Sequence, residues 1–118
     1  MLAVGEYAFG EVDERTQRMT TGFSGGVADE RHYLCGAFSA GVMIIGALYG
    51  RTQPDVDETM CYAKVRQYRD RFEGQLGSVT CSELRAEMYG SGRVEPCSVL
   101  VERAVKILLG VLDEGSTR

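Results

Sequence analysis

The segment YLCGAFSAGVMIIGALYG, residues 33–50, carries no charged side chain and is the most apolar part of the chain. It is long enough to be weighed as a membrane span, but its four glycines and its serine dilute the hydrophobicity. Residues 29–31 and Arg51, which flank it, show no cationic bias of the kind that orients membrane helices. We therefore predict a helix over about residues 34–49 that is buried in the core of a globular domain.

The composition is that of an ordinary globular protein, with 118 residues, of which 44% are hydrophobic and 25% are charged. This length suffices for a single domain, residues 1–118, with a sizeable core. The net charge of −4 and the isoelectric point near 5.0 argue against nucleic acid as a partner, because phosphate binding needs a basic surface. The first residues lack the cationic start of a secretion signal, so we expect a cytoplasmic protein with reduced thiols.

Apolar residues recur at helical spacing along most of the chain, and no stretch alternates in the manner of a β-strand. Besides the central segment, we predict helices over about residues 1–9, 13–23, 56–76 and 96–113, and a short helix that follows Ser78 and ends near Tyr89. In the longest of these, the apolar stripe consists of Cys61, Val65, Tyr68, Phe72 and Leu76. We predict an all-α fold, a compact single-domain bundle of five to six helices with short loops.

The last predicted helix is apolar on more than one face, since Ile107, Leu109 and Val111 widen its main stripe. Such a helix is either central in its own chain or part of a contact between two chains. An apolar surface that one chain leaves exposed usually marks an interface, and two-fold pairing lets one patch cover its own copy. We expect a homodimer.

The four cysteines are not equivalent. Cys35, Cys81 and Cys97 each fall at the predicted start of a helix, where free N–H groups and the helix dipole favour a thiolate and raise its reactivity and metal affinity. Cys61 falls in the middle of a helix, where a buried thiol that only fills space is the simpler interpretation. The chain has no C-x-x-C pair, so a thioredoxin motif or zinc ribbon is absent, and its single histidine, His32, suits a solvated loop.

Small residues follow the first of these cysteines, at Gly36, Ala37 and Gly41. They leave room beside the thiol for a second thiol, a ligand or a cluster, and we treat all three as candidate cofactor-binding residues. A close crossing of two helices would explain the same residues equally well.

Five short motifs follow one another in a characteristic order: GFSGG (residues 22–26), LCGAFSAG (34–41), MIIGALYGRT (43–52), GSVTCSEL (77–84) and PCSVLVERAVKIL (96–108). Together they resemble the redox-active protein family named for its C_GCAxxG_C_C cysteine pattern, over nearly the whole chain. Cys35, Gly36 and Ala37 match the element around its central cysteine, and Cys81 and Cys97 match the two later cysteines. The resemblance implies a small protein with redox-active thiols, and many family members are encoded near transporter genes.

The match is incomplete at two places. Gly41 stands one position later than the family glycine, and the first family cysteine has no counterpart here. That cysteine belongs to a helix before Met1, so either one thiol has been lost or a segment that carries it precedes this chain. The uncapped start at Met1 favours the second explanation, and Cys61 does not replace the missing cysteine.

The leading hypothesis is a thiol-based redox or metal-thiolate protein that acts in electron transfer through Cys35, Cys81 and Cys97. The same three cysteines are the candidate catalytic residues and the candidate metal ligands, with an iron–sulfur cluster or zinc as the candidate cofactor. The alternative is a helical binding or accessory module, associated with a transporter, in which the cysteines are structural. Expected partners are a second copy of the chain and a redox protein or a transporter-linked protein, but neither nucleic acid nor a membrane.

Overall fold

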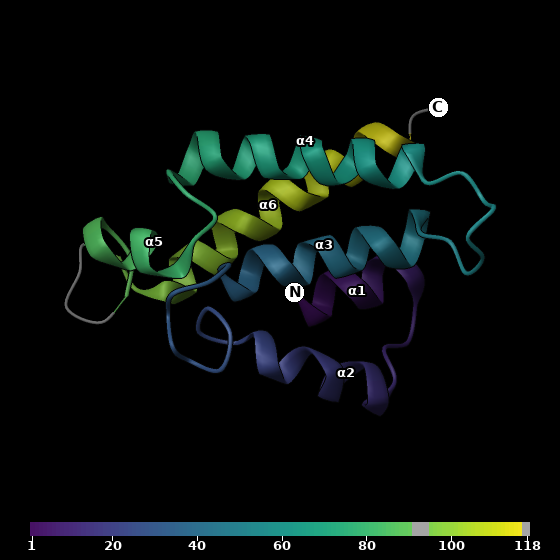
Figure 1. Cartoon of the computed structure of the whole chain (residues 1–118). Helices are drawn as coiled ribbons and strands as arrows, with labels where there is room; N and C mark the ends of the chain where they lie inside the picture. The colour runs from purple at the N-terminus through teal and green to yellow at the C-terminus, as the bar shows by residue number, and fades with distance from the viewer. Residues whose placement is uncertain (91–94, 117–118) are drawn as a thin grey trace.

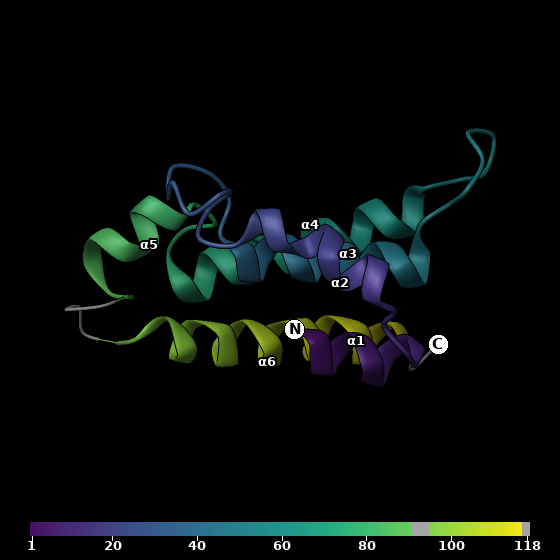
Figure 2. The ribbon, with the colours of Figure 1, turned by 90° about the horizontal axis from the view of Figure 1, so that it is seen from below.

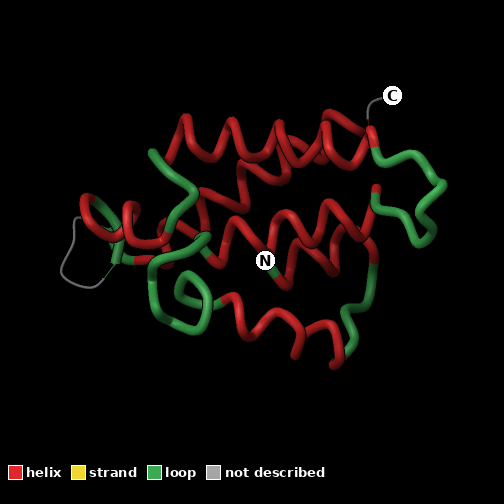
Figure 3. Tube along the Cα trace, viewed as in Figure 1, coloured by secondary structure: helices red, strands yellow, loops and turns green. Residues whose placement is uncertain are grey.

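A computed structural model describes residues 1–90 and 95–116 of the chain. Its elements are α1 (Leu2–Phe9), α2 (Glu14–Thr20), the 3₁₀-helix η1 (Thr21–Phe23), α3 (Gly36–Tyr49), α4 (Thr59–Leu76), α5 (Cys81–Glu87) and α6 (Cys97–Ser116). Within the described residues, β-structure is limited to two isolated bridges (Figure 3). The predicted all-α fold is therefore confirmed.

The central helix of the fold is α3, which contacts α1, α4 and α6 (Figure 1). Viewed from below, α1 and α6 form one layer, and α2, α3, α4 and α5 lie above it (Figure 2). Six residues of α3 are buried, among them Phe38, Ile44 and Ile45. Among the described residues, no helix is both long enough and apolar enough to cross a membrane. The uncharged segment is thus a core helix, as its glycines predicted.

The longest stripe, on α4, faces this core through Tyr68 and Phe72, which are fully buried. The predicted start of α4 was three residues early. Asp57 accepts hydrogen bonds from the backbone N–H of Thr59 at 2.9 Å and from its hydroxyl at 2.6 Å, and this local turn delays the helix to Thr59. The helix ends, as predicted, at Gly77, which has a φ of 100°.

Part of the apolar surplus of α6 is covered within the chain. Ile107 and Val111 are buried, whereas Leu109 is only partly buried. The helix packs on both α3 and α4, and this explains why it is apolar on more than one face. Two of the three residues that suggested an interface therefore belong to the core, and the homodimer stays a prediction.

A polar residue that the stripe analysis missed also lies in the core. Lys64 on α4 is 2% exposed, and its Nζ donates a hydrogen bond to the carbonyl of Val111 at 3.0 Å. This hydrogen bond uses one of the N–H donors of the ammonium group and joins α4 to α6. Sequence periodicity marks lysine as a surface residue, so only the packing of the two helices places it inside.

Candidate thiol site

An isolated antiparallel bridge joins the N-terminus of α3 to that of α5. Leu34 pairs with Thr80, the N–H of Cys35 donates to the carbonyl of Val79 at 2.7 Å, and the N–H of Cys81 donates to the carbonyl of Tyr33 at 2.9 Å. Cys35 is the N-cap residue of α3, and Cys81 is the first residue of α5. Two cysteines that are far apart in sequence are thus fixed by backbone hydrogen bonds at neighbouring helix ends.

The third cysteine is brought to the same region by the start of α6. A second bridge pairs Tyr89, just after α5, with Glu95, just before α6. Cys97 is the first residue of α6, and Nη1 of Arg85 on α5 lies 3.6 Å from its Sγ in hydrogen-bond geometry. The prediction that all three cysteines stand at helix N-termini is confirmed.

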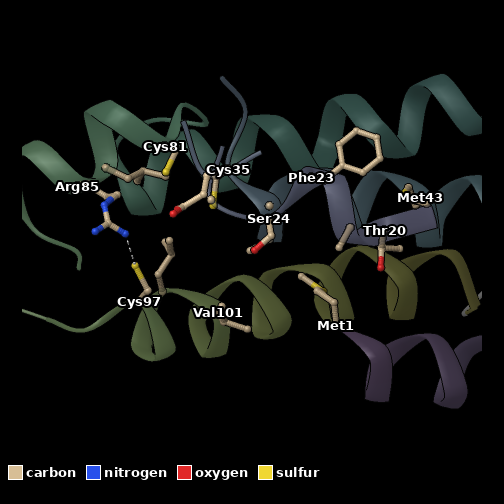
Figure 4. Close-up of a pocket in the computed structure, with 17 residues that line it drawn as sticks. Met1, Thr20, Phe23, Ser24, Cys35, Met43, Cys81, Arg85, Cys97 and Val101 are labelled. Atoms are coloured by element: carbon tan, nitrogen blue, oxygen red, sulfur yellow. Dashed lines mark hydrogen bonds between the residues drawn. The ribbon is translucent and has the colours of Figure 1, made fainter. Parts of the chain in front are cut away.

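These three cysteines line one pocket, with a volume of about 490 Å³. Figure 4 shows Cys35, Cys81 and Cys97 at one end of it, with Arg85 beside Cys97. Cys61 is absent from the lining. It packs against the core, but it is only partly buried and not buried as expected.

An irregular loop forms part of the pocket wall, through Ser24, Gly25 and Asp29. Gly25, Gly26, Val27, Ala28 and Asp29 are consecutive residues with φ between 54° and 70°. A Cβ on Gly26 would overlap Cys81, so the loop backbone lies directly against that side chain. Two consecutive glycines, Gly25 and Gly26, are typical of a turn, but the left-handed conformation also extends to residues with side chains, which seldom adopt it.

Burial dominates the electrostatics of Cys35, which is 6% exposed. It raises the pKa of the Cys35 thiol, and the charges of Cys81 and Cys97 raise it further, while hydrogen bonds from the backbone of Phe38 and Ala37 lower it. The N–H groups at the helix N-terminus therefore lower the pKa of Cys35, as predicted, but by less than burial raises it. The expectation of a readily formed thiolate is wrong for Cys35, because desolvation outweighs the hydrogen bonds.

The balance at Cys81 is similar but involves more charges. Burial raises the pKa of this thiol, Arg85 and Arg31 lower it, and Cys97 and Asp29 raise it, with a net increase. The residue is 7% exposed. Arg85, which sequence analysis did not single out, is thus the largest favourable influence on a thiolate at Cys81 and also contacts Cys97.

The three small residues expected to hold a cofactor separate into two groups. Gly36 and Ala37 line the pocket, together with Ala40. Gly41 does not, because the ring of Tyr68 fills the space beside it. Gly41 therefore serves a close approach of α3 and α4, which was the alternative interpretation.

All four cysteines are free thiols. Over residues 1–90 and 95–116, no group of three or more His, Cys, Asp or Glu side chains is arranged to hold a metal ion. His32 is exposed, as expected for a loop histidine. The three thiols therefore line the same pocket but are not arranged as a preformed metal site.

A helical domain with three cysteines on one pocket defines a class, the small all-α thiol proteins. The chain belongs to the family described as "Putative redox-active protein (C_GCAxxG_C_C)", whose model matches residues 1–111. The description gives the family a redox role in general terms. Comparisons with curated proteins and with solved structures gave no match.

Proposed function

We propose that this protein is a thiol-based redox protein whose working groups are Cys35, Cys81 and Cys97. The observation that carries the proposal is that three separate helix N-termini bring three thiols to one pocket and leave the fourth, Cys61, outside it. Buried cysteines that only fill space need no shared cavity. The family description, which gives a redox role without naming a reaction, agrees with this proposal.

The proposed reaction is thiol–disulfide exchange with an external disulfide. Cys97 is the most accessible of the three, so its thiolate attacks one sulfur of the external disulfide, breaks that S–S bond and releases a thiolate. A second pocket thiol, Cys81 or Cys35, then attacks Cys97 in the mixed disulfide and releases the other half. The protein loses two electrons and two protons, and the external disulfide gains both as two thiols.

Two other interpretations make different predictions for the same thiols. A metal-thiolate or iron–sulfur form would require the three sulfur atoms to move into a common coordination geometry. A binding or accessory module with structural cysteines would keep all thiols inert, and the low exposure of Cys35 and Cys81 favours this alternative. Cytoplasmic location and a transporter-linked partner remain part of the proposal.

The deciding experiment combines metal analysis with disulfide mapping. Protein prepared without oxygen is analysed for iron and zinc, exposed to hydroxyethyl disulfide, and digested so that new disulfides are located by mass spectrometry. We expect a reversible disulfide between two of the three pocket cysteines. Cys61→Ser should form it as the unchanged protein does, whereas Cys97→Ser should form it much more slowly. Bound metal with inert thiols would favour the metal form, and inert thiols without metal would contradict a redox function.

A further inference from the structure

The lining of the pocket includes a basic side chain. Arg85 is the only lysine or arginine among its lining residues, and it stands at the end where the cysteines gather (Figure 4). Among the described residues, no carboxylate lies within ion-pair distance of its guanidinium. The only acid in the lining, Asp29, is 3.6 Å from Arg31 instead. A partly buried guanidinium that no described carboxylate neutralises is available to an anion from outside.

Backbone packing holds this guanidinium in place. A Cβ on Gly90 would lie 3.3 Å from Cζ of Arg85, so the planar group rests against the Gly90 backbone. Gly90 has a φ of 112°, and its N–H donates to the carbonyl of Glu95 at 2.8 Å. The cation is therefore supported by the same bridge that positions the start of α6.

Toward the described residues, Arg85 uses only a small part of its hydrogen-bonding capacity. A guanidinium has five N–H donors, and the one contact seen here joins Nη1 to Cys97 Sγ at 3.6 Å. A thiol sulfur is a weak acceptor, whereas a carboxylate accepts two parallel hydrogen bonds from the guanidinium. An incoming carboxylate would therefore gain more from Arg85 than the thiol gains.

From these contacts we propose that the pocket takes small sulfur-reactive molecules that carry a carboxylate, and that Arg85 binds that carboxylate while Cys97 reacts. The inference rests on the proposed redox function and names its substrate class as small disulfides of carboxylic acids. Leu100, Val101 and Met43 supply an apolar wall for the carbon chain. The volume of about 490 Å³ lies in the range of ordinary small-molecule sites.

Exchange with such a disulfide follows the same electron balance as any other. The Cys97 thiolate forms a bond to the near sulfur, the S–S bond of the substrate breaks, and a carboxylate-bearing thiolate leaves and takes up a proton. A second pocket thiol then releases the other half by attacking Cys97. Arg85 supplies no electrons or protons and acts only by binding the carboxylate.

Two alkylating reagents test the anion site without any disulfide chemistry. Iodoacetate and iodoacetamide react alike: the thiolate forms a C–S bond, the C–I bond breaks and iodide leaves. They differ in that only iodoacetate carries a carboxylate. Because any effect of Arg85 on Cys97 reactivity acts on both reagents, it cancels in the ratio of the two rates. Each cysteine lies in a different tryptic peptide, so mass spectrometry gives this ratio separately for Cys97 and Cys61.

We expect the iodoacetate-to-iodoacetamide ratio at Cys97 to exceed that at Cys61, and to fall about tenfold in Arg85→Gln, the scale of a charge-assisted hydrogen bond. Arg31→Gln is the matched control, because Arg31 is also a cation near Cys81 but does not line the pocket. Its ratio should stay unchanged. Circular dichroism shows whether each variant is folded.

An unchanged ratio in Arg85→Gln, or an equal fall in Arg31→Gln, would overturn the proposal. If Arg85→Gln does not fold, the ratio is measured instead in Arg85→Lys and, for the unchanged protein, as a function of salt concentration. A ratio at Cys97 that changes with neither would also overturn the proposal. The two proposals fail separately. A preference for iodoacetate at Cys97 without disulfide formation would support the carboxylate site and contradict the redox function. Disulfide formation without that preference would support the redox function and contradict the carboxylate site.

Discussion

The ring of Tyr68 on α4 occupies the space that a Cβ at Gly41 on α3 would need. Tyr68 is fully buried, its hydroxyl donates to the carbonyl of Ala37 at 3.1 Å, and its ring stacks on Phe38 with centroids 5.4 Å apart. Tyr68 thus contacts α3 in its first turns, next to Cys35. This contact holds the N-terminal half of α3, which begins next to Cys35, against α4.

The first prediction concerns this close approach. Gly41→Ala should lower the free energy of unfolding by about 1–3 kcal/mol, because the new methyl group overlaps a buried ring that cannot move freely. Gly46→Ala is the matched control on the same helix, since nothing lies within 4 Å of an added Cβ there. It should stabilise the protein by up to about 1 kcal/mol through helix propensity. Urea unfolding measures both, and equal effects would contradict the packing described.

The second prediction concerns the order in which the thiols react with neutral iodoacetamide. Cys97 and Cys61, which are partly buried, should be labelled before Cys35 and Cys81, which are buried. Burial limits access, and it also raises the pKa of Cys35 and Cys81. Sequence analysis interpreted Cys61 as a buried thiol, but its partial burial places it among the faster pair. Peptide mapping of a time course at pH 8 gives the four rates, and labelling of Cys35 as fast as that of Cys97 would contradict the predicted order.

The third prediction is that stability falls in alkali. Burial raises the pKa of Cys35, Cys81 and Tyr68 in the folded chain, so these groups keep protons that the unfolded chain releases above about pH 9. Their contribution is fully present below that pH and is lost as the pH rises through the folded pKa values. Urea unfolding between pH 7 and 10.5 should show the decline, with a smaller decline in Cys35→Ser. A free energy of unfolding that does not decrease over this range would exclude the mechanism.

The fourth prediction tests the left-handed loop. Gly26→Ala should lower the free energy of unfolding by about 2 kcal/mol or more. A φ of 69° is unfavourable for an L-residue, and the new methyl group overlaps Cys81. Labelling of Cys81 should become faster as the loop is displaced. Gly22→Ala is the control, since an added Cβ there meets nothing within 4 Å, and it should change stability by less than about 0.5 kcal/mol. Similar values for the two variants would show that the loop does not pack on Cys81.

Local sequence patterns determined the helices of this protein and the place of its cysteines on them. The spacing of apolar residues marks α3, α4 and α6, and Gly77 ends α4, because helix formation and termination depend on neighbours a few residues apart. Cys35, Cys81 and Cys97 stand at helix starts for the same local reason. The start of α4 was misplaced because the Asp57 side chain competes for the backbone N–H of Thr59.

Which of these residues meet depends on how the helices pack against one another. An isolated bridge between Leu34 and Thr80, which are far apart in sequence, and a second, between Tyr89 and Glu95, bring the three thiols to one pocket. No local pattern encodes the first pairing. Burial also reversed the expected acidity of Cys35, since desolvation depends on every element packed around the thiol. The packing of the helices also places Arg85 beside Cys97 and Gly41 against the ring of Tyr68. Helix periodicity is a property of neighbouring residues, whereas the chemistry of a pocket depends on the whole fold.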